Sequence, residues 1–286
     1  MLSRLRGIFS LLPVISVLGV FYFLHSTYYA EHPFPAAFLS DQYTVGALYY
    51  GTKKLPDIVV SDEEINSRPH FGSVTVLELQ RTISQKILRQ HMDSYKGKDG
   101  FLVWSSPKSS DYTASAPGLD DTQYIVNGFL QGYMPYQVDN VFIPLYVLSK
   151  KKRYQYDHIV HKGKQERWQT SQQAFHYPRG DCEDHAIALA DWLIELGHDA
   201  RVVLGDFDGV GHAWVVLFKE GKEYLLEATD KSYGRRKQRY PLAKYEPKYH
   251  PQWMFNQTDF WSNSGSKFTT SYSSDKWIKK SHYNRI

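Results

Sequence analysis

The sequence predicts an α+β fold in which a buried helix, beginning at a cysteine, packs on an antiparallel sheet. Three observations predict it. Residues 186–196 are rich in strong helix formers and are followed by Gly197, placed as the stop of a helix. Three later segments have the composition of strands: residues 201–204, 212–218 and 223–228. The last two are joined by Glu220-Gly221, which predicts a tight turn and therefore an antiparallel hairpin.

The composition indicates a folded protein with a large core. The chain has 286 residues, of which 42% are hydrophobic and 15% are aromatic, whereas disordered chains are poor in both classes. Its only cysteine, Cys182, excludes an internal disulfide framework and a zinc site built from several cysteines. A core of this size needs no disulfide, so the composition is compatible with export.

The N-terminus has the pattern of a membrane segment. Arg4 and Arg6 precede residues 7–30, which contain no Lys, Arg, Asp or Glu, and the apolar centre of this run is residues 8–24. A spanning helix needs about 20 such residues, and arginines before it favour a cytoplasmic N-terminus. We therefore expect a membrane anchor or signal segment over residues 1–30. The expected location is the cytoplasmic membrane, single-pass, with the catalytic domain on the extracytoplasmic (periplasmic) side; a cleaved signal peptide is the alternative.

The rest of the chain divides into three regions. Residues 31–119 are expected to form a connector and an N-terminal helical region, with an amphipathic helix over 74–92 and a loop over 94–122. Residues 120–232 are the predicted catalytic core. Residues 233–286 are a C-terminal extension.

The C-terminal extension is basic and rich in aromatic residues. Residues 231–286 contain twelve Lys and Arg against three Asp and Glu, a net charge of +9, so the remainder of the chain carries −5. Basic and aromatic side chains together suit a polysaccharide, anionic headgroups or single-stranded nucleic acid. For an exported protein, contact with a cell-envelope polymer is a candidate and no nucleic acid is expected. The favoured expectation is that 251–261 packs back on the core, with 262–274 as a surface excursion.

The segment Gly180-Asp181-Cys182-Glu183-Asp184 carries the chemistry of the chain. Asp181 is a good N-cap, and Asp184 three residues later resembles a capping box, which puts Cys182 in the first turn of the helix. A helix N-terminus lowers the pKa of a thiol, and its free N–H groups can hold an oxyanion. The alternative is that Cys182 is a small buried hydrophobe, but its charged neighbours argue against an apolar site.

A histidine and a carboxylate follow in the order expected for a thiol nucleophile, its base and the residue that orients the base. His212 lies thirty positions after Cys182, and Glu227 lies fifteen positions after His212. With a two-residue turn, Glu227 lies opposite Trp214 and on the same sheet face as His212. Asp230 would then point to the other face, and a bulge or three-residue loop would reverse this choice.

The acidic residues around the cysteine have a second interpretation. Asp181, Glu183 and Asp184 could hold a hard cation such as calcium through their carboxylate oxygens. The alternative is that they only cap the helix and complement its dipole.

Together these segments resemble the transglutaminase-like superfamily, and most closely the bacterial, LapG-like transglutaminase-like cysteine proteinases. The resemblance covers residues 120–232 and is specific over 168–230. It is carried by Trp168-Gln169-Thr170, Arg179-Gly180-Asp181-Cys182-Glu183-Asp184-His185-Ala186, Gly211-His212-Ala213-Trp214 and Leu226-Glu227-Ala228-Thr229.

The resemblance implies a papain-like or transglutaminase-like core with Cys182 as nucleophile on the helix and with His212 and Glu227 on the sheet. The family usually has aspartate as the third member; glutamate, one methylene longer, can still orient an imidazole. The resemblance also adds Trp168 and Gln169 as candidates for substrate or oxyanion contacts. It supports calcium at Asp181, Glu183 and Asp184.

The sequence thus predicts a membrane-anchored cysteine hydrolase, a protease or amidase, with a Cys-His-Glu triad and an acyl-enzyme. Its partner is a protein or peptide substrate, and it requires no cofactor, although calcium is a candidate. Release of the acyl group to an amine would make it a crosslinking transamidase. The alternative from another class is a catalytically silent transglutaminase-like module that binds peptide or cell-envelope polymer as a scaffold.

Overall fold

The computed structural model describes residues 67–231 and 241–285, and the predicted N-terminal membrane segment lies outside these residues. The strands are β1 Ser73–Val76, β2 Arg81–Ile83, β3 Leu102–Ser106, β4 Ser109–Pro117, β5 Gln123–Ile125, β6 Arg153–Tyr154, β7 Arg179–Gly180, β8 Asp199–Phe207, β9 Val210–Lys219, β10 Lys222–Leu226, β11 Tyr249–Phe255, β12 Asp259–Asn263 and β13 Trp277–Asn284. The α-helices are α4 Gln85–Asp93, α5 Ile143–Lys151, α6 Asp157–Val160, α7 Ser171–His176 and α8 Cys182–Glu195, and the 3-10 helices are η3 Val126–Phe129 and η4 Ala243–Tyr245.

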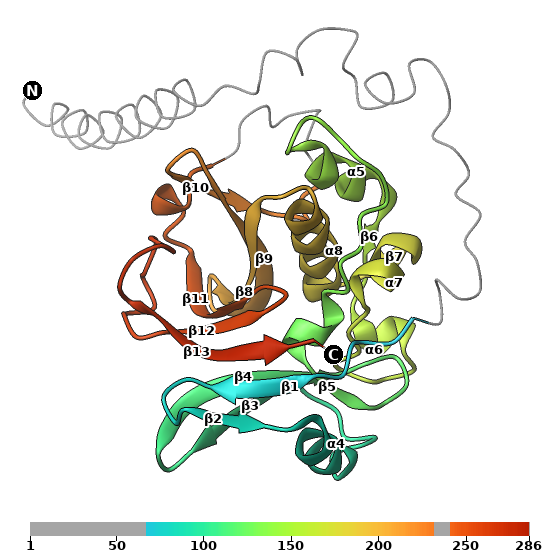
Figure 1. The fold of residues 1–286 in the computed structure, drawn as a ribbon. Coiled ribbons are helices and arrows are strands. Elements are labelled where there is room, and N and C mark those ends of the chain that lie inside the picture. The colour runs from blue at the N-terminus through green and yellow to red at the C-terminus, as the bar shows by residue number, and fades with distance from the viewer. Residues whose placement is uncertain (1–66, 232–240, 286) are drawn as a thin grey trace, which may run out of the picture.

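An eight-stranded antiparallel sheet forms the body of the molecule, in the order β10-β9-β8-β11-β12-β13-β1-β2. Helix α8 packs on β8 and β9, and α5 and α7 pack on α8 (Figure 1). The small sheet β3-β4-β5 packs below β12 and β13. The predicted α+β class, with the cysteine-bearing helix on an antiparallel sheet, is therefore confirmed.

The sequence of α8 explains both its burial and the position of its end. Its residues from Ala186 to Leu193 are buried almost without exception, because the helix lies between the sheet and two other helices. It ends as predicted at Gly197, whose φ of 86° allows the backbone to turn, and the N–H groups of Gly197 and His198 bond to the carbonyls of Ile194 and Leu193.

The hairpin β9–β10 also forms as the sequence predicts. Lys219 pairs with Lys222 and Val215 pairs with Leu226, so the turn holds only Glu220 and Gly221. Both turn residues have positive φ, 53° and 70°, which is the conformation that matches the twist of a two-residue hairpin. This register decides which side chains share a face with His212.

The N-terminal region differs from expectation. The predicted helix over 74–92 is two strands followed by α4, because Val74 and Val76 are buried with the alternation of a strand that pairs with β13. The predicted loop over 94–122 contains β3 and β4, and the Ser- and Ala-rich β4 is buried by packing on β12 and β13.

In the C-terminal region, the expectation that 251–261 packs on the core is confirmed. These residues lie in β11 and β12, and Phe255 and Phe260 belong to the main core. Together with β13, these strands join the large sheet.

The predicted location in the cytoplasmic membrane needs correction. Within 67–231 and 241–285, we find no helix that combines the length and the apolar character needed to cross a membrane. The longest described helix, α8, has 14 residues and carries Asp191 in its buried face.

Candidate functional site

The start of α8 is shaped by Gly180. The short parallel pair β6–β7 places Tyr154 beside Gly180, and the Gly180 carbonyl accepts a hydrogen bond from the Gln155 N–H (2.9 Å). A Cβ at Gly180 would lie 2.2 Å from Asp184 Oδ2 and 2.7 Å from Lys152 Nζ. A side chain at position 180 would crowd the buried side chains of Asp184 and Lys152. Packing therefore favours glycine immediately before Asp181 and Cys182.

Asp181 and Asp184 do not form the predicted capping box. Asp181 is the N-cap residue of α8, but its side chain makes no capping hydrogen bond. Asp184 Oδ1 instead accepts the backbone N–H of Gln169 (2.8 Å). The reciprocal capping box is therefore absent, because the Asp181 side chain accepts no N–H of the first turn.

Cys182 is the first residue of α8 and packs against the main core. Its thiol donates to Glu183 Oε2 (3.4 Å), and the Ala213 backbone N–H, next to His212, donates to its sulfur. Burial, followed by the charge of Asp181, raises the pKa of the thiol to about 12. The pKa of Cys182 is therefore raised and not lowered as the sequence predicted, because desolvation and neighbouring carboxylates outweigh the effect of the helix N-terminus.

His212, on β9, is held by Glu227 just beyond the end of β10. His212 Nε2 lies 2.7 Å from Glu227 Oε2, and both side chains are largely buried. The two-residue turn places His212 and Glu227 on one face of the sheet, as predicted from the alternation of side chains along the two strands. Asp230 lies further along, where its backbone N–H donates to the Glu227 carbonyl (3.2 Å).

The Glu227 carboxylate is held in turn by three more donors. Tyr249 on β11 donates its hydroxyl to Oε2 (3.0 Å), and Thr229 donates its backbone N–H (2.9 Å) and its hydroxyl (2.5 Å) to Oε1. Burial raises the pKa of Glu227, but the bonds from His212 and Thr229 outweigh it and hold the pKa below its ordinary value. Glu227 therefore stays ionised and leaves His212 Nδ1 as the nitrogen able to take a proton.

Cys182 and His212 line one cavity of about 310 Å³. Its walls also include the aromatic residues Phe101, Tyr154, Tyr156, Trp168 and Trp253, and the carboxylates of Asp157, Glu166, Asp181 and Glu183. No Lys or Arg of the described chain is among the lining residues. The cavity is thus aromatic and acidic, with the thiol and the imidazole in its wall.

Three of these carboxylates form a group that could hold a metal ion. One oxygen each of Asp157, Asp181 and Glu183 lies within 4.8 Å of the others, and all three residues are buried. Within the described part of the chain, Asp157 Oδ1, Asp181 Oδ1 and Glu183 Oε1 have no hydrogen-bond partner, and His161 Nε2 lies 3.8 Å from Asp157 Oδ1. Burial raises the pKa of Asp157 to about 9 and that of Glu183 well above its ordinary value. Buried, unpartnered carboxylate oxygens fit a hard cation.

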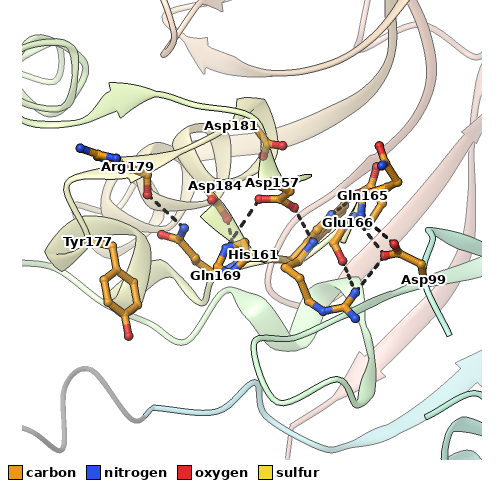
Figure 2. Close-up of polar contacts among 12 residues, drawn as sticks. Asp99, Asp157, His161, Gln165, Glu166, Gln169, Tyr177, Arg179, Asp181 and Asp184 are labelled. Carbon is orange, nitrogen blue, oxygen red and sulfur yellow. Dashed lines mark hydrogen bonds and ion pairs between the residues drawn. The ribbon is translucent and has the colours of Figure 1, made fainter. Parts of the chain in front are cut away.

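This group corrects the calcium set expected from the sequence. Asp157 takes the place of Asp184, which is engaged with Gln169 (Figure 2). Figure 2 shows Asp157 beside Asp181 and in contact with His161, whose Nε2 lies 3.8 Å from Asp157 Oδ1. The second Asp157 oxygen accepts the Arg167 backbone N–H. Nothing in the sequence around Asp157, at the start of the short helix α6, marked it as a ligand.

Of the two residues expected to contact substrate, only Trp168 lines the cavity, where its indole N–H donates to Glu166 (3.0 Å). Gln169 is buried, its Oε1 accepts from Lys152 Nζ (2.9 Å) and its Nε2 donates to the Arg179 carbonyl (3.1 Å), so the structure does not bring it to the cavity. Lys152 and Tyr249 could not be predicted from local patterns, because their contacts join distant segments.

The segment that carries this geometry is similar to known proteins. Residues 166–285, which include Cys182, His212 and Glu227, match the family described as the CEP76 peptidase-like domain. The centrosomal proteins of 76 kDa of Pongo abelii and Homo sapiens are each 46% identical over 55 residues, which is 19% of this chain. The match spans only 8% of the length of these relatives.

Solved structures of Legionella pneumophila LapG are similar at a low level. One matches 48% of this chain and 75% of its own, with 18% identity and a TM-score of 0.35. An EGTA-treated form matches 52% and 80% with 18% identity and a TM-score of 0.37, and a calcium-bound form matches 52% and 81% with 19% identity and a TM-score of 0.36.

Proposed function

We propose that this chain is a transglutaminase-like cysteine hydrolase that cleaves peptide or carboxamide bonds through an acyl-enzyme. The observation that carries the proposal is the 2.7 Å contact between His212 and Glu227 in the wall of the cavity that also contains Cys182. The match of residues 166–285 to a peptidase-like domain supports it.

The proposed reaction uses each side chain at a defined atom. His212 Nδ1 takes the thiol proton, and Cys182 Sγ attacks the carbonyl carbon and forms the tetrahedral intermediate. Backbone N–H groups at the start of α8 hold its oxyanion. His212 then gives the proton to the leaving amine, the C–N bond breaks and the thioester remains. Water, activated by the same imidazole, releases the acid; an amine in place of water would give transamidation.

The thiol also has to be freed from Glu183. We propose that a hard cation such as calcium is held by Asp157, Asp181 and Glu183, each of which has one oxygen without a hydrogen-bond partner among the described residues. Such an ion would supply the positive charge that three clustered carboxylates lack. Glu183 would then stay ionised without a proton, and the first turn of α8 would be held in one arrangement.

Thiol reactivity tests the enzyme proposal directly. The alkylation rate of Cys182 by iodoacetamide is measured by intact mass between about pH 5 and 8, in calcium. We expect His212→Ala to lower the rate at the acid end at least about tenfold, because the imidazole no longer takes the thiol proton. His198→Ala, at the opposite end of α8, is the matched control. A rate that His212→Ala leaves unchanged would contradict the proposal.

A catalytically silent binding module is the second candidate function. The raised pKa of Cys182 and the thiol's bond to Glu183 favour it, because a protonated thiol does not attack a carbonyl. It predicts that Cys182 reacts only at alkaline pH with and without calcium. The enzyme proposal predicts that calcium speeds alkylation near neutral pH.

A further inference from the structure

Glu166 is a carboxylate of the cavity without a cationic partner. Trp168 donates its indole N–H to Glu166 Oε2 (3.0 Å), and no ion pair of Glu166 with a Lys, Arg or His occurs among the described residues. The adjacent Arg167 turns away from the cavity to Asp99 and Asp121. Burial raises the pKa of Glu166 and outweighs the bond from Trp168 and the charge of the neighbouring Arg167, which lower it.

Aromatic rings form the wall beside this carboxylate. Trp168 stacks on Phe101, with ring centroids 5.9 Å apart and planes at 18°, and Phe101 packs on Trp253 at 5.7 Å. All three rings line the cavity. Aromatic faces attract cations and pack on the aliphatic stem of lysine or arginine, whereas an acidic side chain would meet both the rings and Glu166 unfavourably.

The metal-binding group and Glu166 are separate features of the same cavity. Asp157, Asp181 and Glu183 bring three carboxylate oxygens together, whereas Glu166 is not one of that group and accepts the indole N–H of Trp168. A cation held by the three carboxylates would therefore not be bound by Glu166. Glu166 has no ion-pair partner among the described residues, so a cationic group of a ligand in the cavity would be its first.

We propose that Glu166, with the aromatic wall of Phe101, Trp168 and Trp253, selects a lysine or arginine side chain of the substrate next to the attacked carbonyl. This inference rests on the proposed function and names its substrate class. A volume of about 310 Å³ is at the low end of ligand sites, so the selected side chain belongs to a residue adjacent to the reacting bond. Glu166 is thus a specificity-determining residue.

Covalent labelling of Cys182 tests the inference. Three peptidyl acyloxymethyl ketones carry lysine, norleucine or glutamate next to the reactive ketone, and labelling rates are measured by intact mass in saturating calcium. We expect lysine to label about tenfold or more faster than norleucine, and glutamate to label slowest, because a charge-assisted contact has about this effect. Glu166→Gln keeps an acceptor for the indole and should bring the lysine rate down to the norleucine rate.

A matched control separates local contact from overall charge. Asp208→Asn removes one negative charge at an exposed ion pair with Lys248 and should leave the lysine preference intact. Equal rates for the three probes would overturn the inference while leaving the hydrolase proposal standing. A lysine preference that survives Glu166→Gln but disappears in Asp157→Asn would also overturn it. Failure of every probe, in a protein that iodoacetamide also does not label near neutral pH, would contradict the proposed function itself.

Discussion

Tyr249 on β11 donates its hydroxyl to Glu227 Oε2 at 3.0 Å, the same oxygen that holds His212 at 2.7 Å. The two residues are brought together because β11 pairs with β8, and β8 pairs with β9, the strand that carries His212. The carboxylate is therefore held by side chains from two strands, β9 and β11. Since Tyr249 contacts Glu227 and the ring of His212, it acts as a positioning residue for the imidazole.

Tyr249→Phe should slow alkylation of Cys182 near neutral pH by about 2- to 10-fold, since one hydrogen bond contributes about 0.5–1.5 kcal/mol. Glu227→Gln should have a larger effect, because it also removes the charge that stabilises the imidazolium. Tyr272→Phe is the control: it removes a hydroxyl that accepts from the Trp214 indole (3.2 Å) and has no contact with Glu227 among those described. Equal effects of the two tyrosine variants would show that Tyr249 has only a packing role.

The stability contribution of Glu227 should depend on pH. Its pKa in the folded chain is held below the ordinary value of 4.5, so its contribution is present above 4.5 and is lost as pH falls through the folded value. The difference in unfolding free energy between the native chain and Glu227→Gln should therefore shrink at acid pH. Urea unfolding of both proteins at several pH values measures this difference in free energy. The contributions of the other carboxylates are common to both proteins and therefore cancel. A difference that grows toward acid pH would contradict this assignment.

Gly180→Ala should destabilise the protein by about 1–3 kcal/mol, as expected for overpacking against buried groups. Its new Cβ would lie 2.2 Å from Asp184 Oδ2 and 2.7 Å from Lys152 Nζ. Gly211→Ala is the matched control, because nothing lies within 4 Å of a Cβ built there and its φ needs no glycine. Chemical unfolding compares the two variants. Similar losses would mean that the Asp184–Lys152 pair can move aside.

Calcium should raise the midpoint of thermal unfolding, and a chelator should reverse the rise, since a ligand that binds only the folded state stabilises it. Asp157→Asn and Glu183→Gln should each abolish most of the shift, because their oxygens belong to the three-carboxylate group. Asp184→Asn should keep it, since Asp184 bonds to Gln169. Loss of the shift in Asp184→Asn alone would restore the set expected from the sequence.

The sequence predicted the local parts of the site because those parts depend on short-range patterns. The helix at Cys182 and its stop at Gly197 follow from helix propensity and from the left-handed backbone that glycine permits. The choice of Glu227 over Asp230 as the neighbour of His212 follows from the period of two in a strand and a two-residue turn. Residues 94–122 were predicted as a loop and contain strands, because burial against the C-terminal strands stabilises them.

By itself the sequence determined that one cysteine starts a helix and that a histidine and a glutamate share a hairpin face. Only the tertiary structure decided the electrostatics around the thiol, because Asp157 and Glu166 reach the cavity from segments whose local sequence does not mark them as part of the site. A pKa depends on everything that surrounds a group in space. For this reason a cysteine expected to ionise easily is, in the folded chain, a partly buried thiol whose pKa is raised by desolvation and by neighbouring carboxylates.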